Sequence, residues 1–156
     1  MGTNYYFRKK TVDPIRIEAI VDSLNNDYKS LVAKYNEKLH EELSAMGIDS
    51  ILEFDDYHTF ISPVDSDTYG DIHVGKLSVG WKPLLKANGH FNSVSALKQW
   101  YEQNKHEYNF IDEYDEVASF KEFITEIERR NKDDTQKGHP NKHGADGYDW
   151  EYSIFC

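Results

Sequence analysis

One stretch of the sequence comes close to a phosphate-binding loop. Residues 70–77 read GDIHVGKL, which departs from the pattern GxxxxGK[ST] at Leu77, the place of the magnesium-binding hydroxyl. In a true loop the chain next opens a helix, so that the helix N-terminus meets the phosphates. Here Gly80 and Pro83 follow, and both residue types disfavour a helix. We therefore predict two strands around a turn in this region.

Histidines and carboxylates are candidates for metal binding or catalysis. His139 and His143 have the spacing of metal ligands, with Asp146 nearby, but they lie in a polar segment without a helix to align the imidazoles. Cys156 is the single cysteine, which excludes an internal disulfide and a cysteine-based zinc site. The sequence contains neither GxSxG nor a glycine-rich dinucleotide fingerprint. We expect no metal, no cofactor and no catalytic residues, and we lean towards a non-enzyme.

Charge is segregated along the chain. Residues 37–71 contain ten acids and one base, whereas residues 1–12 and 72–101 contain three and four bases and no acid. The net charge of −10 disfavours direct binding to nucleic acid or to an anionic membrane. No run approaches ~18 apolar residues, so we expect no membrane contact and a cytoplasmic location. The segregation reflects either ordinary solvation of different faces or two working surfaces.

A long amphipathic helix is predicted from a regular apolar spacing. Apolar residues recur after Asp13-Pro14 with a 4-3-4-3-4 spacing, at Ile17, Val21, Leu24, Tyr28, Leu31 and Tyr35. Such a stripe packs against the domain's own sheet or against a partner helix. We favour the sheet, and a homodimer through this helix stays open.

The remaining pattern predicts an α+β fold in which a small mixed or antiparallel sheet packs on helices. We expect strands near residues 3–8, 72–77, 79–85, 109–117 and 148–155. We expect helices near residues 14–46, 94–104 and 120–131, the last two capped by serines. The chain of 156 residues is read as one domain, residues 1–156, with a helical and acidic insertion at 13–71 and a flexible loop at 132–147.

Three segments together resemble a family of small uncharacterised phage and prophage proteins. They are TNYYFR at 3–8, IHVGKLSVGW at 72–81 and DEYDEVAS at 112–119. Members of that family begin TNYY, carry HIGKxSxGW and have a DEYG-like turn before a serine-capped helix. They also place a CxxC pair after TNYY, where this chain has the long helix and acidic segment. The resemblance implies a phage origin, the cytoplasm of a host cell and a sheet-based fold, but no activity and no metal.

A ligand site is predicted on the neighbouring strands of the acid-free segments. Aromatic rings there can stack on bases, and lysines with glycine-exposed N–H groups can bind phosphates. The candidate residues are Asn4, Tyr5, Tyr6, Arg8, His73, Lys76, Ser78 and Trp81. The working hypothesis is a phage accessory protein that counteracts host defence by binding or sequestering a small anionic ligand, such as a signalling nucleotide. The bland alternative is that these aromatics form the core and the glycines form turns.

Two further functions stay open. The acidic segment 37–71 suits a protein-binding inhibitor or DNA mimic that docks on a host protein. An unrecognised hydrolase is the third hypothesis, although no group of residues in the sequence supports it.

Overall fold

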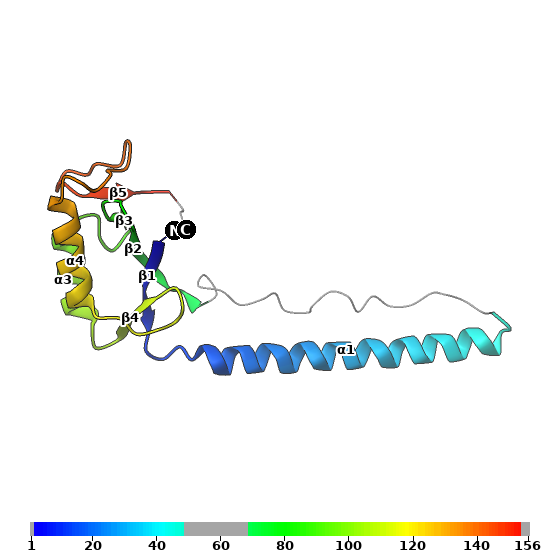
Figure 1. The fold of residues 1–156 in the computed structure, drawn as a ribbon. Helices are drawn as coiled ribbons and strands as arrows, with labels where there is room; N and C mark the ends of the chain where they lie inside the picture. Colours follow the sequence, from blue (N-terminus) through cyan, green and yellow to red (C-terminus); the bar gives the residue numbers. More distant parts are fainter. Residues whose placement is uncertain (1, 49–68, 154–156) are drawn as a thin grey trace. The chain divides into compact units, whose positions relative to one another are not determined.

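The computed structural model describes residues 2–48 and 69–153. Within these ranges the chain forms β1 (Gly2–Lys9), α1 (Pro14–Ala45), β2 (Ile72–Ser78), β3 (Leu84–Lys86), α3 (Val94–Asn104), β4 (Tyr108–Asp112), α4 (Phe120–Lys132) and β5 (Asp149–Glu151) (Figure 1). This is the predicted α+β fold. The chain divides into two compact units: Met1–Val12 with Ser66–Cys156, here called the sheet domain, and Asp13–Asp65, here called the inserted unit.

The sheet is mixed, with the strand order β4-β1-β2-β3-β5. β1 pairs antiparallel with β2 and β4, β2 pairs antiparallel with β3, and β5 adds in parallel to β3. The predicted pair of strands after residue 72 is confirmed. The second of these strands begins later than residue 79, because Gly80 has a φ of 82° and Pro83 has no N–H to donate to a ladder.

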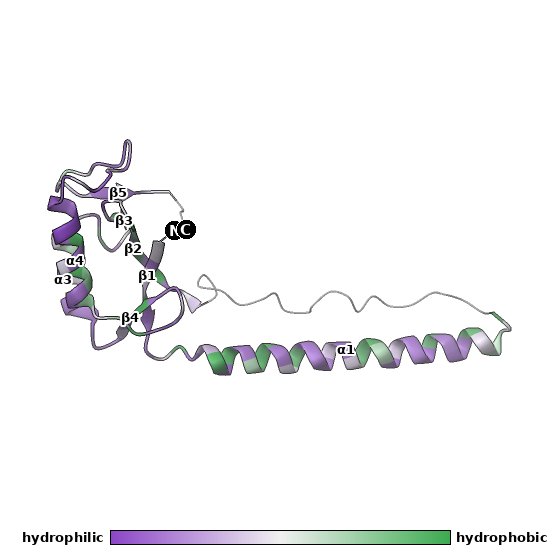
Figure 2. Cartoon of the chain, viewed as in Figure 1, coloured by the Kyte–Doolittle hydropathy of each residue, from purple (hydrophilic) through white to green (hydrophobic). Residues whose placement is uncertain are grey.

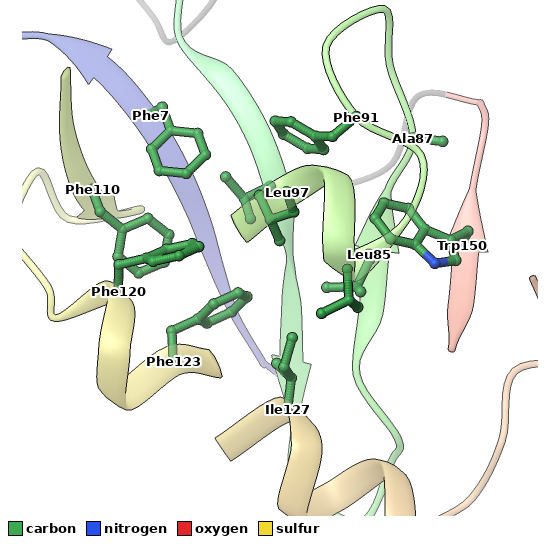
Figure 3. Packing of buried hydrophobic residues seen from close by; sticks show 12 residues of the cluster. Phe7, Leu85, Ala87, Phe91, Leu97, Phe110, Phe120, Phe123, Ile127 and Trp150 are labelled. Carbon is green, nitrogen blue, oxygen red and sulfur yellow. The ribbon is translucent and has the colours of Figure 1, made fainter. Parts of the chain in front are cut away.

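Helices α3 and α4 lie on the same side of the sheet and complete its core (Figure 1). Figure 3 shows Leu97 of α3 and Phe123 of α4 among the side chains of the strands. Phe110 of β4 lies 5.5 Å from Phe7 and 5.0 Å from Phe123, measured between ring centroids. Aromatic rings therefore fill much of a core that has few aliphatic residues, as the composition indicates.

Helix α1 forms as predicted. The Asp13 carboxylate accepts a hydrogen bond from the N–H of Arg16, and Pro14 occupies the first turn, where a missing N–H has no cost. Gly47 adopts a φ of 75° just after the helix, a conformation that favours glycine. Figure 2 shows apolar residues recurring along the helix between polar ones.

The apolar stripe of α1 is only partly buried. Ile17, Val21 and Tyr28 are partly buried, but Leu24 and Leu31 are 44% and 45% exposed, and Tyr35 is also exposed. Leu24, Leu31 and Tyr35 thus lie on an exposed side of the helix within the inserted unit, and their packing against the sheet stays a prediction. Periodicity reports that a helix has an apolar side, but it does not tell what covers that side.

Residues 132–147, predicted to form a flexible loop, make hydrogen bonds with the rest of the sheet domain. The Asp146 carboxylate accepts from the N–H of Val94 at the start of α3 and from Nε1 of Trp150. The Lys137 backbone bonds with both Gly80 and Lys82. These bonds are made by polar side-chain and backbone groups, so they leave no apolar period in the sequence. Mobility of the segment stays a prediction.

Candidate binding surfaces

Five predicted ligand residues meet on the face of the sheet opposite α3 and α4. Tyr5 and Phe7 point into the core, so their neighbours in β1 point the other way. The β1–β2 ladder has a bulge between Tyr5 and Tyr6. Tyr5 therefore pairs with Gly75, whereas Tyr6 pairs with His73 and shares its face of the sheet. We call this set the polar face; it consists of Asn4, Tyr6, Arg8, His73 and Lys76.

Asn4 is at the centre of a hydrogen-bond chain on the polar face. Its backbone N–H and its Nδ2 both donate to the Glu113 carboxylate, at 3.3 Å each. Because the amide donates to Glu113, its Oδ1 faces His73 and lies 3.1 Å from Nε2. Neutral His73 then carries its proton on Nε2. The chain Glu113–Asn4–His73 is a built network, and Asn4 itself is buried.

His73 is held as a neutral imidazole. Burial, together with the nearby cations of Lys86 and Lys76, lowers the pKa of His73 to about 4. The Tyr6 ring stacks on it at a centroid distance of 4.8 Å. Lys86 donates to the backbone carbonyls of Ala87 and Tyr152. At neutral pH this residue therefore offers polarity without charge.

Arg8 is engaged by carboxylates. Its Nε and one terminal nitrogen bind both oxygens of Asp71 at 2.9 and 2.7 Å, and its other terminal nitrogen binds Asp115 at 2.7 Å. The Tyr69 ring lies 4.5 Å from the guanidinium carbon. The hydrogen bonds with Asp71, which have the largest effect, and with Asp115 raise the pKa of Arg8 above its ordinary value. The positive charge of the guanidinium is therefore balanced by the two carboxylates.

The other three predicted residues lie elsewhere. Tyr5 belongs to the core side, where it stacks on Phe110 at 5.3 Å. Trp81 follows β2 and stacks on His139 at 5.0 Å, with the Lys137 ammonium 4.5 Å above its ring. Ser78 ends β2, and its carbonyl accepts from Arg130. The sequence therefore groups eight residues, of which the sheet brings five together.

Sequence reasoning missed the acids that complete the polar face. Glu113 and Asp115 come from the turn after β4, and Asp71 precedes β2. The strands 72–78 and 2–9 are free of acids in sequence, but β4 pairs with β1 and brings its acidic turn beside them. The DEYD motif at 112–115 was visible, but no local pattern tells that it lies next to β1.

A second surface is a row of exposed aliphatic side chains along α1. Ile20, Leu24 and Leu31 stand at positions i, i+4 and i+11, so they share one strip along the helix, and they are 50%, 44% and 45% exposed. We call these three residues the exposed strip. Residues 49–68 of the acidic segment lie outside the described residues. In the part of that segment that is described, Glu37, Glu41 and Glu42 are exposed on α1.

A third feature is a groove of about 610 Å³ between α3 and α4. Tyr101, Phe120 and Ile124 supply its apolar lining. Lys98 and Glu128 form an ion pair of 2.7 Å at its rim. Since charges of both signs line it, the groove selects no class of ligand.

Among the residues that the structure describes, no three His, Cys, Asp or Glu side chains are placed to hold a metal ion. Comparisons with protein-family models, curated proteins and solved structures find no match to the chain. In the described ranges, no helix combines the length and the apolar character needed to cross a membrane.

Proposed function

We propose that the chain is a phage accessory protein that acts by binding, and that the exposed strip of α1 docks in an apolar groove of a host protein. The observation that carries this proposal is the alignment of three exposed aliphatic side chains, Ile20, Leu24 and Leu31, on one strip of a 32-residue helix. Surface residues of this size are common singly, but a row of them along a helix marks an interaction site. Counteraction of host defence is the role we propose for this binding.

The mode of binding follows from the helix. An amphipathic helix that lays i, i+4 and i+11 anchors into a groove is a recurring way for proteins to recognise each other. The polar face supports this proposal, because the hydrogen-bonding groups of Arg8 and Asn4 are already engaged within the fold. Arg8 bonds to Asp71 and Asp115, and Asn4 bonds to Glu113. The sheet domain then serves as the carrier of the helix.

Photo-crosslinking tests the strip directly. A photoreactive residue at Leu24 in the full chain, expressed in host cells, should crosslink one host protein. The matched control is Ala19, which is also exposed but points about 120° away from the strip on the same helix. With the purified partner, Leu24→Gln with Leu31→Gln should weaken binding by about tenfold or more, since lost interface anchors cost at least ~1.4 kcal/mol.

Several outcomes would overturn this proposal. Equal crosslinking from Leu24 and Ala19 would show that the strip is not selective, and crosslinking of the chain to itself would make the surface a homodimer contact. The Ala19→Gln with Ser30→Gln variant should bind like the parent. Circular dichroism of all variants should be equal, because glutamine and leucine have similar helix propensities.

A small anionic ligand on the polar face is the second candidate. It is favoured by the position of two lysines, Lys76 and Lys86, which are both close enough to His73 to lower its pKa, with the Tyr6 ring beside them. Titration calorimetry with a set of mono-, di- and cyclic nucleotides would test it. Lys76→Ala should weaken binding by roughly tenfold or more, because a charge-assisted phosphate contact contributes about 1.5–3 kcal/mol.

The control for that experiment is Lys98→Ala, which removes a cation from helix α3 instead. Glu113→Gln should leave nucleotide affinity equal or increase it, since it removes a negative charge beside Asn4. No heat with any nucleotide, or equal losses for the Lys76 and Lys98 variants, would end this second candidate without touching the first.

A further inference from the structure

The two strands that flank the inserted unit in the sequence pair with each other in the sheet domain. Phe7, near the end of β1, pairs antiparallel with Ile72 at the start of β2. The chain between these strands contains the whole inserted unit, Asp13–Asp65. β1 and β2 therefore form a β-hairpin whose connection has been replaced by a separate unit. We call the end of the hairpin where β1 ends and β2 begins its root. Because no tight turn joins the two strands there, other contacts must hold the root together.

Arg8 bonds across this root. It lies 63 residues from Asp71 in the chain, yet its guanidinium binds both oxygens of that carboxylate. The side chains of Arg8 and Asp71 are 8% and 1% exposed, so the pair is shielded from water. A bidentate pair fixes orientation as well as distance. The Tyr69 ring, 4.5 Å from the guanidinium carbon, adds a contact from the returning chain.

The turn after β4 supplies the second carboxylate. Asp112 accepts hydrogen bonds from the N–H groups of Tyr114 and Glu116, which sets the course of the turn. Asp115 adopts a φ of 66°, a left-handed conformation that aspartate tolerates better than most residues. Its carboxylate thereby reaches Arg8 at 2.7 Å. The guanidinium thus joins three segments that are distant in sequence.

We propose that Arg8 is a clamp that closes the root of the inserted unit, so that the sheet domain keeps its fold when the chain of the inserted unit is cut. The inference rests on contacts within the sheet domain and does not use the proposed function. Removal of the guanidinium would leave the buried Asp71 carboxylate without its charge partner, which is costly in a shielded site.

The experiment uses the full chain with a protease recognition sequence placed after Ser30, an exposed position of α1. The folded protein is cleaved and passed over a sizing column at decreasing concentration. In the parent, the fragment that carries β1 should stay bound through β2, β4 and the clamp. In Arg8→Lys, which keeps the charge and loses the fork, the fragment should dissociate at least tenfold more readily.

The matched control is Lys9→Met, which removes a cation from the next, exposed position of the same strand; its fragment should stay bound as in the parent. Arg8→Met is measured as well, and Arg8→Lys gives the decisive value if Arg8→Met does not fold uncut. Dissociation of the cleaved parent would overturn the proposal. Equal retention in the Arg8→Lys, Lys9→Met and parent proteins would overturn it too, because the clamp would then have no role.

Discussion

Asn4 links the protonation of His73 to the acidic turn after β4. Its amide nitrogen donates to Glu113, which leaves its oxygen to accept from His73. Burial first, and then the nearby cations of Lys86 and Lys76, favour a neutral ring, in agreement with a pKa of about 4. His73, a predicted ligand residue, is therefore a neutral and partly buried member of a hydrogen-bond network.

His73 should make the stability of the sheet domain depend on pH. The pKa of a histidine in the unfolded chain is near 6.5, and folding lowers that of His73 to about 4. The stabilisation is therefore full above pH 6.5 and is lost as the pH falls towards 4, since the unfolded state takes up the proton first. His73→Gln should lose less urea resistance than the parent between about pH 7 and about pH 5. An unchanged loss would contradict this prediction, and exposed His106→Gln is the control.

Gly75 is required because another strand approaches its backbone. A Cβ at this position would lie 2.8 Å from the carbonyl oxygen of Leu84 and 3.1 Å from the Leu85 side chain. Gly75→Ala should therefore lower the free energy of unfolding by about 1–3 kcal/mol. Gly89→Ala meets nothing within 4 Å and should change it by less than about 0.5 kcal/mol. Urea denaturation followed by tryptophan fluorescence would compare the two, and equal effects would argue against the close approach.

At the scale of elements, α1 shows how much a sequence pattern decides. The apolar spacing and the caps at Asp13 and Gly47 predict the helix and both its ends. The same pattern does not distinguish a side that is packed in a core from one that is offered to a partner. What covers an apolar side depends on the arrangement of the whole chain, which no local pattern of residues records.

Truncation of the exposed strip should leave the sheet domain stable. Leu24→Ala should change its free energy of unfolding by less than about 1 kcal/mol, because Leu24 is half exposed and lies in the other unit. Leu97→Ala of α3 should cost about 2–5 kcal/mol, because Leu97 is fully buried. Trp81, Trp100 and Trp150 all lie in the sheet domain, so their fluorescence reports its unfolding. A large loss for Leu24→Ala would return this residue to the core.

The segment before β5 should contribute to stability through Asp146. This carboxylate caps the first turn of α3 at Val94 and accepts from the indole of Trp150, which is buried. Asp146→Ala should lower the free energy of unfolding by about 1–3 kcal/mol, from the lost cap and the unpaired indole N–H. Exposed Asp134→Ala should be neutral. Thermal denaturation of both variants measures this, and equal melting temperatures would contradict the prediction and favour a loop that adds nothing to stability.

At the scale of the whole molecule, short segments of the chain fold back and bond to both edge strands of the sheet. Ile111 of β4 bridges to Val117, and the backbone N–H of Ala118 donates to Phe110. At the other edge Asp149 of β5 bridges to His143, and Trp150 donates to the Lys142 carbonyl. Unpaired edges invite pairing with other chains, so these returns limit sheet extension between molecules.

The sequence predicts the helices and strands of this molecule better than it predicts which of them lie next to each other. Alternation and capping identify β1, α3 and α4, since these are local properties. The five residues of the polar face were predicted because they lie on β1 and β2, two strands that the sequence identifies and that pair with each other. Glu113 and Asp115 were missed because strand order, which sets their distance from β1, depends on packing of the whole sheet.

The position of β1 has a consequence for synthesis on the ribosome. β1 is the first strand to emerge, yet it lies between β2 and β4 and bonds with a residue 109 positions later in the chain. At about 5–20 residues per second, some 5–20 s pass before that residue is made. During this time β1 has no completed sheet to join, whereas α1 can form from local contacts alone. The helix that we propose to bind a partner is thus made, and can be available, before the domain that carries it has folded.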